Sequence, residues 1–220
     1  GQRTASTLPI DNFQISNIEI NGNRLNQTQP TAANDHWSGI YFVSNSTSIT
    51  VRDMFIHDVQ YYGIGFQRDG FVNCRVEDCR IEDTGADGID FKMDVNASGF
   101  GNYIRGVVVS RPGLNVTALG GLLTAQAGID VRHGVDVSDC IVTEIGADVT
   151  GVRINANIDN GSTYRSTITN AKCYSTGGTS SKGFQIGETD AHVVNCYTSG
   201  AEAGFWVRSI GAQFVNCRAD

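Results

Sequence analysis

Two aspartates occupy equivalent places in a repeated segment of this 220-residue chain. Asp90 and Asp130 each end a Gly-Ile-Asp tripeptide, and a basic residue follows two positions later, Lys92 in one case and Arg132 in the other. Two carboxyl groups held close together repel when both are ionised, so the pKa of one rises and the pair can supply an acid and a base. We predict that Asp90 and Asp130 are catalytic carboxylates that act with Lys92 and Arg132.

The same segments allow two other interpretations. Lys92 or Arg132 would instead be the base in β-elimination from a uronic acid, and the acids would hold Ca²⁺, with Asp87 and Asp94 adding ligands. Alternatively, each acid pairs with the basic residue two positions later in a solvated ladder without catalysis. Because two or three nearby acids are a weak metal signal, we expect no metal and no other cofactor.

These acids belong to a motif of Gly, large apolar, any residue, large apolar that occurs seven times. It begins at Gly39, Gly63, Gly88, Gly128, Gly151, Gly183 and Gly204. Side chains alternate between the two faces of a strand, so the residue between the apolar ones points away from the core. Stacked strands then form an outward row of Tyr41, Gly65, Asp90, Asp130, Arg153, Gln185 and Trp206. Asp90 and Asp130 would lie about 5 Å apart on adjacent strands.

The outward row and its flanks predict an exposed strip that binds an oligosaccharide. Aromatic faces stack on sugar rings, while polar groups fix the hydroxyls. Long loops on a rigid scaffold often carry binding residues, and a loop that ends in Asp-His-Trp precedes the first motif strand. The substrate-binding candidates are Tyr41, Gln67, Asp87, Arg153, Gln185, Trp206, Arg208, Trp37 and His36.

A second motif alternates with the first along the chain. It consists of an apolar strand, a polar residue and a residue of the type found in cores. The polar positions are Asn17, Asp53, Asp78, Asp139, Asn195 and Asn216, and Gly106 and Lys172 are the exceptions at the equivalent places. Asn and Asp tolerate the left-handed conformation, so most of these positions predict tight bends.

The cysteines fall largely on the buried-type position of this second motif. Cys79, Cys140, Cys173, Cys196 and Cys217 each follow a polar position, where other repeats have Ile, Met or Val. Cys behaves there as a small hydrophobic residue. We predict that these thiols, and that of Cys74, point inward and are reduced.

The composition agrees with a solenoid of strands. The chain has 19 Ile and 20 Val but only 6 Leu, and Gly contributes 26 residues. β-Branched residues favour strands, and a short repeat buries a core only by stacking on its neighbours. We therefore predict one all-β domain over residues 1–220, a parallel β-helix of about eight coils. A β-propeller needs a longer period, and six Leu exclude a leucine-rich solenoid.

Charge and hydropathy exclude two classes of partner. The net charge of −7 argues against a nucleic-acid backbone as the main ligand. No apolar run approaches 18 residues, so we expect no membrane insertion.

The periodic pattern resembles the right-handed parallel β-helix superfamily of pectate lyases, polygalacturonases and phage tailspikes, over essentially the whole chain. Residues 84–90 (Thr-Gly-Ala-Asp-Gly-Ile-Asp) resemble the Asn-Thr-Asp-Gly segment of polygalacturonases, with Asp87 at the family's acidic position. The segments around Arg132 and Arg153 only partly match the Gly-His-Gly and Arg-Ile-Lys motifs of that family. The resemblance implies a right-handed β-helix.

The tailspike resemblance also implies a setting and a function. It implies a segment of a longer chain that forms a homotrimer and is extracellular or virion-associated. We expect a carbohydrate-active β-helix that binds and cleaves a bacterial surface polysaccharide, as a glycoside hydrolase or a polysaccharide lyase. The alternatives are a non-catalytic structural or glycan-binding β-helix of a virion or cell-surface assembly, and a lyase acting on a uronic acid polymer.

Overall fold

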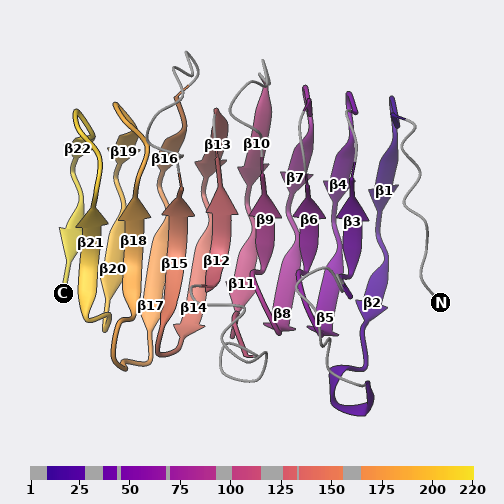
Figure 1. Ribbon diagram of the computed structural model, residues 1–220, viewed down its shortest axis with the longest axis horizontal. Helices are drawn as coiled ribbons and strands as arrows, with labels where there is room; N and C mark the ends of the chain where they lie inside the picture. Colours follow the sequence, from indigo (N-terminus) through magenta and orange to yellow (C-terminus); the bar gives the residue numbers. More distant parts are fainter. Residues whose placement is uncertain are drawn as a thin grey trace.

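The described part of the chain is built almost entirely from short parallel strands. A computed structural model describes residues 9–27, 37–43, 46–67, 70–92, 101–114, 126–132, 134–155 and 165–220, and all structural statements below concern these residues. The strands form three parallel sheets, and successive coils follow one another along the long axis from the N-terminus to the C-terminus (Figure 1). This architecture is the predicted parallel β-helix.

Two of the sheets have eight strands each. The first contains β1 (Gln14–Ser16), β4 (Thr50–Arg52), β7 (Arg75–Glu77), β10 (Asn102–Arg105), β13 (Val135–Ser138), β16 (Thr167–Thr169), β19 (His192–Val194) and β22 (Gln213–Val215). The second contains β2 (Glu19–Asn21), β5 (Phe55–Val59), β8 (Arg80–Thr84), β11 (Val108–Ser110), β14 (Ile141–Ile145), β17 (Lys172–Ser175), β20 (Tyr197–Ser199) and β23 (Arg218–Ala219). Eight strands per sheet confirm the predicted number of coils.

The Gly-led motif forms the third, seven-stranded sheet. Its strands are β3 (Ile40–Phe42), β6 (Ile64–Phe66), β9 (Ile89–Phe91), β12 (Gln126–Val131), β15 (Val149–Ile154), β18 (Lys182–Ile186) and β21 (Ala203–Val207). The last four strands begin before the Gly, so there Gly lies inside the strand rather than at its start. One 3-10 turn, η1 (Arg24–Asn26), lies between β2 and β3, and no described helix is long and apolar enough to cross a bilayer.

Gly is required in this sheet because the coils stack closely. A Cβ atom added to Gly88 would lie 2.6 Å from the carbonyl oxygen of Gly128, and one added to Gly128 would lie 2.8 Å from that of Gly151. None of these three glycines has a positive φ. Close approach of backbones, rather than a left-handed conformation, therefore explains the repeated Gly.

The bends predicted from Asn and Asp exist between the two eight-stranded sheets. Asn17, Asp53, Asp78, Asp139, Asn195 and Asn216 all have φ between 50° and 59°, and Gly106 has φ 67°. The prediction for Lys172 was wrong: Asn170 has φ 55° and makes that bend, while Lys172 is the first residue of β17. The Asn side chains also form a ladder, because Asn195 donates to Asn170 at 3.2 Å and Asn170 donates to Asp139 at 3.0 Å.

The core is filled by the inward positions of all three sheets. The apolar pairs of the motif are buried from Ile40 and Phe42 through to Phe184 and Ile186. The ring of Phe66 stacks on that of Phe91 with 4.3 Å between centroids. Alternation thus fixes the inward face, and with it the direction of the outward row.

The cysteines are core residues with free thiols. Cys74, Cys79, Cys140, Cys173 and Cys196 are buried, Cys217 is partly buried, and all six are free. Cys173 does not follow a bend as predicted, because Ala171 takes that place. It lies instead on β17, opposite Val142 of the neighbouring coil.

Candidate active site

The outward row has the predicted register. Asp90 is paired with Asp130, Asp130 with Arg153, Arg153 with Gln185 and Gln185 with Trp206. These residues come from β9, β12, β15, β18 and β21 in that order. The number of residues between successive motifs varies along the chain. The register is therefore set by the Gly and apolar positions and not by a fixed repeat length.

The row is not the exposed strip that the sequence predicted. The side chains of Asp90 and Asp130 are 0% and 1% exposed, and Gln67, Arg153 and Gln185 are also buried. Alternation fixes only the direction of a side chain, and neighbouring rows then cover it. Here Lys92 and Arg132 contact the two acids, and they are only 28% and 27% exposed.

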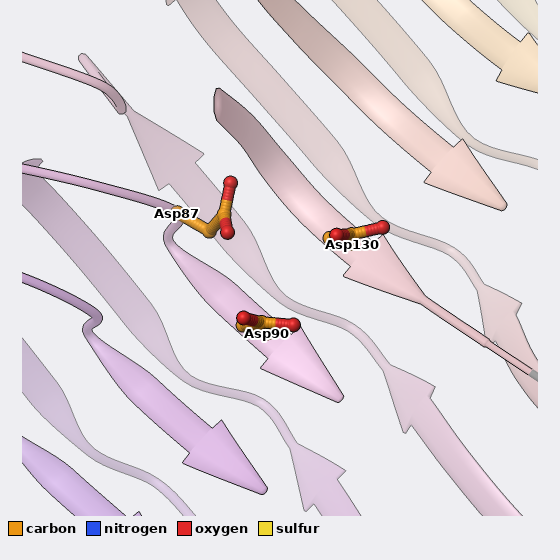
Figure 2. A group of neighbouring side chains, drawn as sticks. All are labelled: Asp87, Asp90 and Asp130. Atoms are coloured by element: carbon orange, nitrogen blue, oxygen red, sulfur yellow. The ribbon is translucent and has the colours of Figure 1, made fainter. Parts of the chain in front are cut away.

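Three carboxyl groups meet in this buried region. Asp87 comes from the residue pair before β9, and it joins Asp90 of β9 and Asp130 of β12 (Figure 2). One oxygen from each of the three acids lies within 4.8 Å of the others. The predicted separation of about 5 Å between Asp90 and Asp130 is therefore met, and Asp87 belongs to the same cluster.

Three cations balance the three acids. Lys92 Nζ lies 2.6 Å from Asp90 Oδ2, and Arg153 Nη2 lies 2.7 Å from Asp130 Oδ2 and 3.8 Å from Asp87 Oδ1. Arg132 is more distant, with Nη2 3.9 Å from Asp130 Oδ2. We call these six residues the acid cluster.

Hydrogen bonds satisfy the acid cluster only in part. Asp87 accepts a hydrogen bond from the backbone N–H of Ala127. Within the described residues, the Oδ1 atoms of Asp90 and Asp130 are buried without a hydrogen-bond partner. Buried carboxylate oxygens without partners are costly, so this arrangement differs from a satisfied structural ion pair.

Burial shifts the titration of two of the acids. Desolvation raises the pKa of Asp87 well above its ordinary value, because the opposing effect of Arg153 is smaller and Asp90 and Asp130 add repulsion. Desolvation also raises the pKa of Asp90, against the nearby Lys92. Burial within the cluster therefore favours the protonated forms of Asp87 and Asp90.

The acid cluster does not match a metal site well. Each of the three acids offers one oxygen that could bind a metal ion. However, Lys92 and Arg153 already contact the carboxylates of Asp90 and Asp130. These cations supply the positive charge that Ca²⁺ would bring, and a further cation would be repelled. The candidate ligand Asp94 lies outside the described residues.

Sequence reasoning missed two tyrosines beside the cluster. Tyr62 accepts a hydrogen bond from Lys92 Nζ at 3.1 Å, and its hydroxyl lies 3.4 Å from that of Tyr61. Both tyrosines are buried, and desolvation raises their pKa values, so both stay protonated at neutral pH. Tyr62 immediately precedes Gly63, as Asp87 precedes Gly88. The residue before each motif Gly was therefore the signal that could have found it.

The remaining candidates are spread along the sheet. Tyr41 is half-buried and packs near Tyr61 and Tyr62, and Gln67 donates a weak 3.4 Å hydrogen bond to the backbone carbonyl of Asp90. Trp37 is 41% exposed and lines a cavity of about 510 Å³ with Gln27 and Gln60, before β3 and away from the acids.

Two candidates lie at the far end of the row and one cannot be placed. Trp206 is 37% exposed on β21, and Arg208 is exposed just beyond it. The guanidinium carbon of Arg208 lies 5.0 Å from the centre of the Trp206 ring. His36 lies outside the described residues.

Comparison of the chain with protein-family models and with curated proteins finds no match in either. The fold and the acid cluster are thus the basis for assigning a function.

Proposed function

We propose that this β-helix binds a polysaccharide and hydrolyses its glycosidic bonds with the acid cluster. The observation that carries the proposal is the meeting of three buried carboxyl groups within 4.8 Å, with unpartnered oxygens on Asp90 and Asp130. Such an arrangement is costly for stability, and strongly perturbed carboxyl groups gather at catalytic sites. Glycosidases need one protonated and one ionised carboxyl group.

The surroundings of each acid assign the roles. Among the described residues, Arg153 at 3.8 Å is the only cationic partner of Asp87, so Asp87 retains the proton and donates it to the glycosidic oxygen as the bond to the anomeric carbon breaks. Asp130 lies 2.7 Å from Arg153 and provides the carboxylate that attacks the anomeric carbon. Water then hydrolyses the glycosyl ester, with the Asp87 carboxylate accepting its proton. Asp90 and Lys92 balance each other's charge as an ion pair.

The separation favours retention of configuration. Carboxyl groups about 5–5.5 Å apart are typical of retaining enzymes, whereas inverting enzymes need about 6.5–9.5 Å to admit water. Because the acids are buried, the Lys92 and Arg132 side chains must swing outward before a sugar can reach them. Both side chains are partly exposed, so the movement is confined to these two side chains.

A lyase is the second candidate, with Lys92 as the base. Lys92 Nζ lies in a 2.6 Å ion pair with the buried Asp90, so this ammonium group is engaged by a carboxylate of the cluster rather than directed at a substrate. We therefore place hydrolysis first. The homotrimeric, virion-associated or extracellular setting implied by the tailspike resemblance stays part of this proposal, as does a purely glycan-binding role if cleavage is absent.

The test is cleavage of a panel of bacterial capsular polysaccharides, measured as new reducing ends. We expect Asp87→Asn and Asp130→Asn each to lower the rate by at least about 100-fold. Asp139→Asn is the matched control, since Asn occupies the same bend in other coils, and it should keep full activity. Full activity in both cluster variants would contradict the assignment. Ultraviolet absorbance from unsaturated uronates would instead show a lyase.

A further inference from the structure

The last strand of the seven-stranded sheet carries an exposed indole with two cations close to its ring. Lys182 Nζ lies 4.7 Å from the centre of the Trp206 ring, and the guanidinium carbon of Arg208 lies 5.0 Å from it. Lys182 comes from β18 and the other two residues from β21 and its end. Like-charged groups gather at one ring only at an electrostatic cost, which the negative face of the ring partly offsets.

Neither cation is neutralised by a described carboxylate. Within the described residues, neither Lys182 nor Arg208 forms an ion pair with a carboxylate. Nine other described basic residues do so: Arg52, Arg80, Lys92, Arg105, Arg111, Arg132, Arg153, Arg165 and Arg218. Among the described residues, Lys182 and Arg208 thus bring two cations without ion pairs to one exposed aromatic ring, in a chain with a net charge of −7.

The charges on this face of the sheet are separated by depth. The acids of the outward row, Asp90 and Asp130, are fully buried, whereas Lys182 is half-buried and Arg208 is exposed. A ligand approaching this end of the sheet therefore meets an indole and two positive charges. Glu202, just before β21, accepts a hydrogen bond from the backbone N–H of Ser180 and forms no ion pair with Lys182, whose Nζ donates to the Ser180 carbonyl at 3.1 Å.

We propose that Trp206, Lys182 and Arg208 form a subsite for a sugar that bears a carboxylate or a sulfate group. The indole packs against the pyranose ring, and the two cations bind its anionic group. Resting on the proposed function, this subsite gives the cleaved polysaccharide a chemical class: it is an anionic glycan.

The register also places the subsite relative to the acid cluster. Trp206 is paired with Gln185, Gln185 with Arg153 and Arg153 with Asp130. Three strand spacings correspond to about 14 Å. A single sugar cannot reach both places, so the subsite holds one part of a chain while the cluster acts on another. Monosaccharide glycosides should be poor substrates.

Fluorescence can report on this subsite alone. The chain has two Trp residues, so Trp37→Phe leaves Trp206 as the only indole. We expect polygalacturonate or dextran sulfate to change its fluorescence, with weaker binding at high salt, and neutral dextran to have no effect. The response to each anionic polymer identifies carboxylate or sulfate as the preferred group.

Charge-removing variants complete the experiment. Lys182→Gln with Arg208→Gln should weaken binding of the anionic polymer at least tenfold. The control is Lys172→Gln with Arg75→Gln, which removes two described cations without ion pairs from the other sheets and should leave binding unchanged. An equal response to neutral dextran, no response to either anionic polymer, or unchanged affinity in the test variant would overturn the subsite.

The two proposals fail separately. Asp130→Asn in the Trp37→Phe protein should abolish cleavage and keep the fluorescence response. Binding to Trp206 without any cleavage by the parent protein would reject the hydrolase and keep the subsite. Cleavage of a polysaccharide that is unaffected by loss of Lys182 and Arg208 would reject the subsite and keep the hydrolase.

Discussion

At the scale of single residues, the unusual feature is a buried carboxyl group whose pKa is raised by desolvation. Asp87 is almost fully buried beside two other acids, and its pKa is raised well above the ordinary value. The desolvation that raises this pKa also opposes folding once the carboxyl group ionises. The contribution of Asp87 to the free energy of unfolding must therefore depend on pH, and the direction of its pKa shift determines the sign of that dependence.

The sign of this dependence leads to the first prediction. Between the unfolded pKa of about 3.9 and the higher folded value, the native state binds more protons than the unfolded state. The free energy of unfolding therefore falls as pH rises through this window. We expect Asp87→Asn to flatten this fall, so that the variant gains stability relative to the parent between pH 4 and pH 7. Urea unfolding at several pH values measures it.

A matched variant separates this effect from general charge loss. Asp139→Asn removes a carboxylate from an exposed bend, so the pH dependence of its unfolding free energy should follow that of the parent. A parent protein whose stability rises steadily from pH 4 to pH 7, with the same slope in Asp87→Asn, would mean that Asp87 ionises normally in the folded state.

At the scale of residues, the sequence predicted the register of the two aspartates correctly, but it did not predict that neighbouring side chains bury them. Gly and apolar spacing placed Asp90 beside Asp130 correctly, because stacking of coils is set by those positions. Their burial could not be foreseen, since it depends on how far the Lys92 and Arg132 side chains fold back over the acids. Tyr62 was missed because the predicted outward row contains only residues that follow a motif Gly, whereas Tyr62 precedes Gly63.

At the scale of elements, strand stacking depends on the absence of side chains at the motif Gly. The Gly sequence signal is therefore a packing signal. The Asn and Asp positions predict bends for a physical reason as well, because these residues tolerate the left-handed conformation, but Lys172 does not lie at a bend. There Asn170 makes the left-handed turn two residues earlier, and β17 begins two residues after it, as β14 begins two residues after Asp139. Variable loop lengths make such shifts hard to see without coordinates.

A single methyl group tests the stacking. Gly128→Ala would place a Cβ atom 2.8 Å from the carbonyl oxygen of Gly151 and against the side chain of Val142. We expect a loss of about 1–3 kcal/mol in the free energy of unfolding, because backbone of the next coil has little room to move. Denaturant unfolding measures it.

Gly146 provides the control for this substitution. An added Cβ there has nothing within 4 Å, and φ is not positive, so Gly146→Ala should change stability by no more than about 1 kcal/mol, in the favourable direction. Equal stability of the Gly128 and Gly146 variants would show that close coil stacking is not the reason for the motif Gly.

At the scale of the whole molecule, the β-helix is a one-dimensional stack in which each coil contacts chiefly its neighbours. The cysteines sample this stack at several depths along its axis. Cys79 and Cys140 lie in the middle coils, while Cys217 precedes β23 at the C-terminal end and is only partly buried. Thiol chemistry can therefore report how the stack opens.

The last prediction concerns the order in which the thiols react. Burial raises the pKa of Cys79 to about 11 and that of Cys140 to about 12, so little thiolate forms at neutral pH and reagent access is blocked as well. We expect Cys217 to be alkylated first in the native protein and the middle thiols only as coils open. All six should react after denaturation without reductant.

Mass spectrometry of peptides after timed labelling measures the order. Equal rates at Cys140 and Cys217 would mean that the stack opens in one cooperative step, and fewer than six reactive thiols after denaturation would reveal a disulfide.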